Sequence, residues 1–331
     1  MAHYIDPAHW CIVRADEPGT GLLAEGGAQS SVPVQFSPVG EAATPFRRAL
    51  HRAAALAPNS QVMITVAEGQ RVEWESSSWL VRPERRFIAE SLAGVSLTLA
   101  AAIMVVAAHS TANVITILPA RCTVTEEGAL QRAIRYAIAE LPDVPEGMAT
   151  LGMLDLEEPI DEDYLLVERP RGGSGLELHR LARRPVPWVA RHLRDQGALV
   201  ASGILVGYAG AFAAHLSMAC PKLSIRLARL GEAAARLGAE CKIPSAAMNG
   251  IAPAILRSIR LQPPTLPLRV FGVARSGWCG LKSANAVAHR AAFCERAARI
   301  AHTASSGRAS PAEVRLPEES HQSIAALEYG S

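Results

Sequence analysis

The sequence predicts an α/β protein with a mainly parallel central sheet flanked by helices, and two observations carry that prediction. Short apolar runs alternate with helical periodicities from residue 10 to residue 154, which is typical of a parallel, doubly wound sheet. After Glu157 the pattern changes to short extended segments around a glycine-rich loop, which indicates an antiparallel insertion. With 49% hydrophobic and 19% charged residues, the 331-residue chain has ample apolar surface for a packed core.

The alternating elements lie in the first half of the chain. Strands are expected where short runs of apolar residues, many of them branched, lack a helical period, at residues 10–13, 62–66, 114–118 and 150–154. Helices are expected between the strands, at residues 44–56, 88–106 and 127–141. In the last of these, Leu130, Ile134 and Ile138 recur at helical spacing and would face the sheet. Residues 33–36 are expected to be extended and residues 74–80 to form a loop or short helix.

The second half begins with two edge or antiparallel segments, residues 161–168 and 177–185. The elements expected after them are a helix, a strand, two helices and a late strand, at residues 188–195, 198–206, 208–218, 223–237 and 268–273. Residues 301–331 are polar and contain Gly307, Pro311 and Pro317, which predicts a flexible C-terminal tail.

Charge and cysteine content exclude several classes of protein. The net charge of +2 does not favour a nucleic-acid partner. The first ten residues have neither the basic region nor the apolar core of a secretory signal, and no two of the six cysteines have C-x-x-C spacing. We therefore expect a cytoplasmic protein with reduced cysteines. Its only lysines are Lys222, Lys242 and Lys282, so a mechanism that needs a lysine has three candidates.

Two apolar stretches keep a membrane-associated interaction protein open as an alternative. Residues 91–108 contain no charged residue, and residues 197–220 contain only His215 as an ionisable group. Both are long enough to cross a bilayer. Both also contain small residues and lead into strand-like or turn-like segments, as buried elements of an α/β fold do, so we expect them to be buried in the core.

The best candidate for a functional site lies between Val114 and Glu127. A buried strand ends at Pro119, Ala120-Arg121-Cys122 follows, and Thr125 and the two glutamates after it open a helix. Ligands of open α/β sheets bind beyond the carboxyl ends of the strands. A second candidate follows the first strand, where Gly19-x-Gly21-x-x-Ala24 fits a dinucleotide-binding fingerprint, although residues 25–31 are a poor helix. A plain glycine turn remains the alternative there.

The order of these segments resembles the nucleotide-sugar pyrophosphorylases, a nucleotidyltransferase family, and most closely the mannose-1-phosphate guanylyltransferases. The resemblance covers roughly residues 10–290 and rests on many short fragments. The family fragments G-T-x-L, P-K-Q-F, Q-P-x-N-R-G-T-A and P-S-D-H resemble residues 19–22, 33–36, 82–89 and 119–122. D-Y-G-x-I, F-x-E-K-P, W-N-S-G and G-W-x-D-L-G-T resemble residues 163–167, 181–185, 200–203 and 277–283.

The resemblance implies a Rossmann-like nucleotidyltransferase (GT-A type) fold that binds GTP or a nucleotide sugar. Residues 1–300 would form one domain, with a nucleotide-binding half (1–157) and a sugar-phosphate-binding half (158–300). The candidate nucleotide-binding residues are Gly19, Thr20, Gly21, Gln35 and Arg86. The candidate sugar-phosphate-binding residues are Arg121, Tyr164, Arg184 and Ser202.

At the matching positions, this sequence lacks the residues that bind the metal and the phosphates in the family. The two carboxylates that hold Mg²⁺ in the family are replaced by Arg121 and Gly280, and the loop arginine and two lysines by Gly21, Val34 and Arg184. Because Mg²⁺ requires oxygen ligands, we expect no metal, no cofactor and no catalytic residue of the family type. The sequence thus predicts a pseudoenzyme with a nucleotide or nucleotide sugar as ligand.

Several alternatives stay open. Arg121 either replaces the metal as an organic cation on a phosphate or is a neutral substitution paired with an acid such as Glu126. The chain could also be an active, metal-independent transferase that recruits acids after the main sheet, namely Asp161, Glu162, Asp163 or Glu168. An active paralogue or a second copy of the chain is the expected protein partner.

Overall fold

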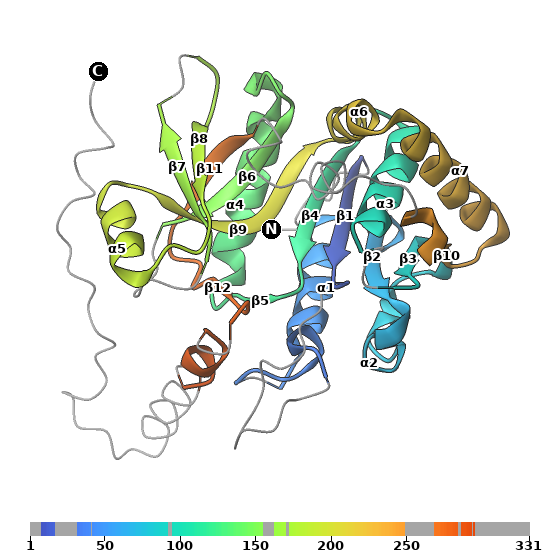
Figure 1. Ribbon diagram of the computed structural model, residues 1–331, viewed down its shortest axis with the longest axis horizontal. Helices are drawn as coiled ribbons and strands as arrows, with labels where there is room; N and C mark the ends of the chain where they lie inside the picture. Colours follow the sequence, from blue (N-terminus) through green and yellow to red (C-terminus); the bar gives the residue numbers. More distant parts are fainter. Residues whose placement is uncertain are drawn as a thin grey trace.

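A computed structural model describes residues 8–16, 32–40, 42–91, 95–154, 162–169, 172–248, 268–283, 286–292 and 294. One long, twisted sheet runs through the molecule and helices cover both of its faces (Figure 1). The C-terminal tail predicted from the sequence and the glycine loop after residue 16 lie outside the described residues.

The strands and helices of the first half confirm most of the predicted elements. The strands are β1 (His9–Arg14), β2 (Val62–Ala67), β3 (Arg86–Ala89), β4 (Val114–Pro119), β5 (Cys122–Thr123) and β6 (Met148–Met153). The helices are α1 (Pro45–Leu56), α2 (Arg71–Glu75), α3 (Val95–His109) and α4 (Glu127–Glu140). The Thr44 side chain caps α1 by accepting a hydrogen bond from the N–H of Arg47 at 3.3 Å.

The second half adds strands to the same sheet. Its strands are β7 (Tyr164–Glu168), β8 (Leu176–Ala182), β9 (Leu199–Tyr208), β10 (Cys241–Ile243), β11 (Arg269–Val273) and β12 (Cys279–Gly280). Its helices are α5 (Pro187–Asp195), α6 (Ala209–Ala219) and α7 (Pro221–Leu237). The strand β9 lies between β4 and β6, so one continuous sheet contains strands from both halves of the chain.

The sheet is mixed, and the prediction of a mainly parallel sheet was wrong. Its order is β10-β3-β2-β1-β4-β9-β6-β11-β8-β7. The strands from β10 to β4 are parallel to one another, but β9 runs antiparallel to both β4 and β6. The strand β9 lies outside the alternating series predicted for residues 10–154, and the helices α6 and α7 that follow it lie on the same side of the sheet (Figure 1).

Two hydrophobic clusters cover the two faces of the sheet. On one face, Phe46 and Leu50 of α1 and Leu130 and Ile134 of α4 pack against the strands. On the other face, the strands pack against α3, α6 and α7. Because α3 is apolar around its whole circumference, its buried residues fit a central position between the sheet and these two outer helices.

Three short elements differ from the sequence prediction. The helix predicted from residue 88 was wrong at its start, because residues 88 and 89 belong to the strand β3 and α3 begins only at Val95. The strand β10 pairs with β3 at the sheet edge and was not predicted, because three residues are too few for a periodic signal. Val34–Phe36 forms a turn of 3₁₀ helix rather than an extended segment.

The two apolar stretches are parts of the fold. The first contains most of α3, which packs in the second cluster, and the second is divided between β9 and α6. Among the described residues, no helix combines the length and the apolar character required to cross a membrane.

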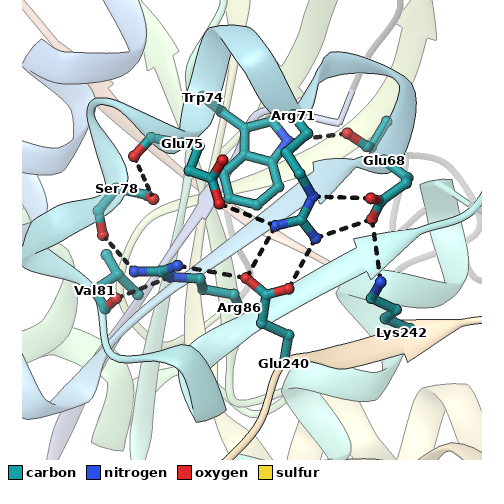
Figure 2. Close-up of polar contacts among 10 residues, drawn as sticks. Glu68, Arg71, Trp74, Glu75, Ser78, Val81, Arg86, Glu240 and Lys242 are labelled. Atoms are coloured by element: carbon teal, nitrogen blue, oxygen red, sulfur yellow. Dashed lines mark hydrogen bonds and ion pairs between the residues drawn. The ribbon is translucent and has the colours of Figure 1, made fainter.

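An ion-pair network ties the edge strand β10 to the segment after β2 (Figure 2). The Arg71 guanidinium donates to Glu68 at 2.8 Å and to Glu240 at 2.8 Å, and its Cζ lies 4.8 Å from the ring centroid of Trp74. Arg86 donates to the other oxygen of Glu240 at 3.4 Å. Burial alone would raise the pKa of Glu240, but Arg71 and Arg86 outweigh it and lower the pKa below its ordinary value.

We expect Glu240→Gln to lower the free energy of unfolding by about 1 to 2 kcal/mol at neutral pH, because both arginines lose a charged acceptor. The folded-state pKa is lowered, so this stabilisation is present above the ordinary glutamate pKa and is lost as the pH falls through the folded value. Urea unfolding of both proteins at about pH 7 and about pH 3 measures it. A difference that stays constant with pH, or an equal loss in Glu232→Gln on the exposed face of α7, would contradict this role.

Candidate functional site

The candidate site lies where the loop after β4 meets the loop after β11. The strands β5 and β12 pair antiparallel, with Gly280 opposite Cys122, at the carboxyl end of β4 (Figure 1). Further hydrogen bonds join the loops. The N–H of Glu126 donates to the Ser276 carbonyl at 2.9 Å, and the Thr125 hydroxyl donates to the Gly277 carbonyl at 3.2 Å. Thr125 therefore ties two loops together, and no side chain caps the start of α4.

A buried carboxylate occupies the centre of this junction. Glu162 has no exposed surface, and its Oε2 lies 2.5 Å from the Nζ of Lys282, whose side chain is 28% exposed. Apart from this ammonium, no hydrogen-bond donor reaches either oxygen of Glu162 among the described residues. A buried carboxylate with a single cationic partner is an expensive arrangement, since water and further donors are both excluded.

Gly280 provides the space for that carboxylate. A Cβ built on Gly280 would lie 1.9 Å from Oε1 of Glu162 and 2.9 Å from the indole ring of Trp278. No side chain fits at position 280 while Glu162 holds its place. The missing side chain of Gly280 thus leaves room for a carboxylate from a different segment.

Arg121 lies beside the same carboxylate. Its Nη2 donates to the Leu281 carbonyl at 3.1 Å, and its own carbonyl accepts from the N–H of Leu281 at 3.0 Å. Burial raises the pKa of Glu162 above its ordinary value and Asp163 adds to the rise, whereas Lys282 and Arg121 oppose it. The carboxylate consequently has two cations nearby in a place where burial disfavours its charged form.

The other predicted sugar-phosphate residues surround this junction in structural roles. Tyr164 is buried in the first cluster at the start of β7. The Ser202 hydroxyl donates to the Leu151 carbonyl at 2.6 Å and accepts from the N–H of Ile204 at 3.0 Å, at the irregular part of the β6–β9 pairing. Arg184 is exposed with a left-handed φ of 37°, and its N–H donates to Asp163 at 3.2 Å.

The predicted nucleotide-binding residues are not brought together in the described part of the chain. Gly19, Thr20 and Gly21 lie outside the described residues. Gln35 is buried, and its amide donates to the Ala15 carbonyl at 3.1 Å, next to the end of β1. Arg86 lies in the ion-pair network of β10, donating also to the Val81 carbonyl at 3.0 Å, so its guanidinium is engaged away from the junction (Figure 2).

Sequence reasoning missed Lys282 as a site residue and named Glu162 only among several recruitable acids. The signal for Lys282 was weak, because it is one of three lysines and its partner lies in a distant segment. Asp161 lies outside the described residues, and Glu168 is 64% exposed at the end of β7 beside His179. Among the described residues, no group of three His, Cys, Asp or Glu side chains has the geometry of a metal site.

Comparison with known proteins identifies the fold. The sequence matches no protein-family model, and no curated protein matches it in sequence. Among solved structures, a mannose-1-phosphate geranyltransferase from Thermus thermophilus is 19% identical with a TM-score of 0.56, over 82% of this chain and 75% of that one. A mannose-6-phosphate isomerase from Helicobacter pylori is 17% identical with a TM-score of 0.57, over 82% of this chain and 98% of that one.

At these identities the likeness concerns the fold alone. The chain has a Rossmann-like α/β fold built on a mixed sheet, and it shares this fold with both structures.

We expect Gly280→Ala to destabilise the protein by about 1 to 3 kcal/mol, because the new methyl group overlaps the Glu162 carboxylate. The cost should fall by at least half when Glu162 is also replaced by alanine, which removes the overlapping oxygen. Unfolding free energies of the two single variants and the double variant measure this coupling. Additive costs would show that the two residues do not share this space.

Proposed function

We propose that this chain is a nucleotidyltransferase-fold protein that binds a nucleotide or nucleotide sugar without a divalent metal, in a sensing or regulatory role. The observation that carries the proposal is the presence of two cations, Arg121 and Lys282, near the buried Glu162. Two neighbouring cations, both of them partly exposed, favour an anionic ligand. We propose GTP or GDP-mannose as the first ligands to try, since one similar structure is named for mannose-1-phosphate.

The residues at this junction do not fit Mg²⁺. A hard cation needs several oxygen ligands, and Arg121 and Gly280 provide no side-chain oxygen. Glu162 does provide a carboxylate, but the Lys282 ammonium lies 2.5 Å from it. A divalent ion would have to displace this ammonium and would also face the Arg121 charge. The proposal therefore includes the loss of metal-dependent catalysis, and it retains an active paralogue or a second copy of this chain as the expected protein partner.

A second candidate function is a metal-independent nucleotidyl transfer to a sugar 1-phosphate. Its support is the same pair of cations, which could neutralise phosphate charge where Mg²⁺ does so in related chemistry. The sugar phosphate oxygen would attack the α-phosphate of GTP and pyrophosphate would leave. Pyrophosphate release from GTP and mannose 1-phosphate in excess EDTA, lost in Lys282→Ala, distinguishes this function from a binding protein.

We expect calorimetric titration with GDP-mannose to give micromolar affinity that is unchanged by Mg²⁺ or EDTA, because protein cations replace the metal. Lys282→Ala should weaken binding about tenfold or more, which corresponds to the loss of one charge-assisted contact. Lys222→Ala is the matched control, since this lysine lies exposed on α7, away from the junction.

Two results would contradict the proposed function. Binding of neither GTP nor GDP-mannose would exclude a nucleotide ligand of this kind. Pyrophosphate release that requires Mg²⁺ would show that the chain is a metal-dependent enzyme after all.

A further inference from the structure

In the Glu162–Lys282 pair, an internal carboxylate occupies a cation that an external anion could otherwise bind. Glu162 is completely buried, yet one partly exposed ammonium is its single polar partner among the described residues. Buried carboxylates that serve only stability normally accept several hydrogen bonds. The scarcity of donors is therefore a reason to ask what else Lys282 could bind.

The charges that act on Glu162 are those of Lys282, Arg121 and Asp163. Arg290 brings a further positive charge to the junction, where it donates to the Thr125 hydroxyl at 3.3 Å. Cys279 of β12 also faces this region, and burial raises its thiol pKa to about 11, so it adds no charge at neutral pH. If Glu162 became neutral, the junction would have an excess positive charge that an incoming anion could satisfy.

The geometry favours exchange of partners at Lys282. The ammonium is reachable, because the Lys282 side chain is 28% exposed, whereas Glu162 lies behind it in the notch left by Gly280. Arg121, which is partly exposed, is fixed to the backbone of Leu281, the residue next to Lys282. Both cations can thus meet one anion from the solvent side while Glu162 stays in its notch.

We propose that Arg121 and Lys282 form an anion site for the diphosphate group of a nucleotide sugar, and that Glu162 is the internal counter-ion which this group displaces from Lys282. The displaced carboxylate, left buried without its ammonium, takes up a proton from solvent. Ligand binding is consequently coupled to proton uptake. We call Arg121 and Lys282, with Glu162 as their internal counter-ion, the masked anion site. That the ligand is a nucleotide sugar rests on the proposed function, whereas the existence of the masked anion site does not.

The test compares wild type with Glu162→Gln, using inorganic pyrophosphate as the probe. The amide keeps the shape of the side chain and removes the competing charge. We expect Glu162→Gln to bind pyrophosphate about tenfold tighter than wild type at neutral pH, since a neutral residue 162 leaves Lys282 available. Replacing Lys282 by alanine in the same variant should abolish the gain. Glu168→Gln replaces an exposed acid at the end of β7 and should bind as wild type does.

Proton uptake provides a second readout. Calorimetry of pyrophosphate binding in two buffers of different ionisation enthalpy counts the protons bound, and wild type should take up more than Glu162→Gln. Wild-type affinity should also rise more steeply than that of the variant as the pH is lowered, because burial already favours the neutral form of Glu162. Thermal unfolding of each variant confirms that it is folded.

The outcomes separate this inference from the proposed function. If wild type and Glu162→Gln bind pyrophosphate with equal affinity and equal proton uptake, the masked anion site is wrong, even if wild type binds GDP-mannose. Failure of both proteins to bind pyrophosphate at millimolar concentration would overturn it as well. If wild type binds no nucleotide sugar but Glu162→Gln binds pyrophosphate through Lys282, the anion site stands and the proposed ligand is wrong.

Discussion

The buried charge of Glu162 is the constraint on which the candidate site depends. A carboxylate with no exposed surface requires a cation at contact distance, and Lys282 provides it at 2.5 Å. It also requires space, which exists only because residue 280 has no side chain. These two features lie within three residues of each other in the sequence, so one short segment supplies both the charge and the room that Glu162 needs.

The antiparallel strand β9 is what allows the distant segments to meet. It lies between β4, which leads to Arg121, and β6, which pairs in turn with β11, the strand that leads to the loop of Gly280. It also pairs with β7, which begins directly after Glu162 and Asp163. The junction therefore has a rigid base made of neighbouring strands, although its residues come from three separate parts of the chain.

The sequence predicted the positions of most strands along the chain, but not whether each strand runs parallel or antiparallel to its neighbours in the sheet. Apolar runs located β1, β2, β4 and β6 because a buried strand must be apolar throughout. The same run at β9 carries no information on direction, so the mixed sheet could not be read from it. That Arg121 and Gly280 stand where the resembling family has metal ligands stays a prediction from the resemblance. The pairing of Glu162 with Lys282 depends on contacts between segments, which no periodicity encodes.

A comparison of two ion-pair clusters in the described part of the chain, those of Glu240 and Glu162, shows why the second is better suited to a ligand. Glu240 shares two arginines, its pKa is lowered, and any competing anion would have to break an already favourable arrangement. Glu162 has one ammonium, its pKa is raised, and its charged form is disfavoured by burial. Exchanging its partner for a phosphate oxygen therefore costs less free energy than breaking a fully satisfied pair.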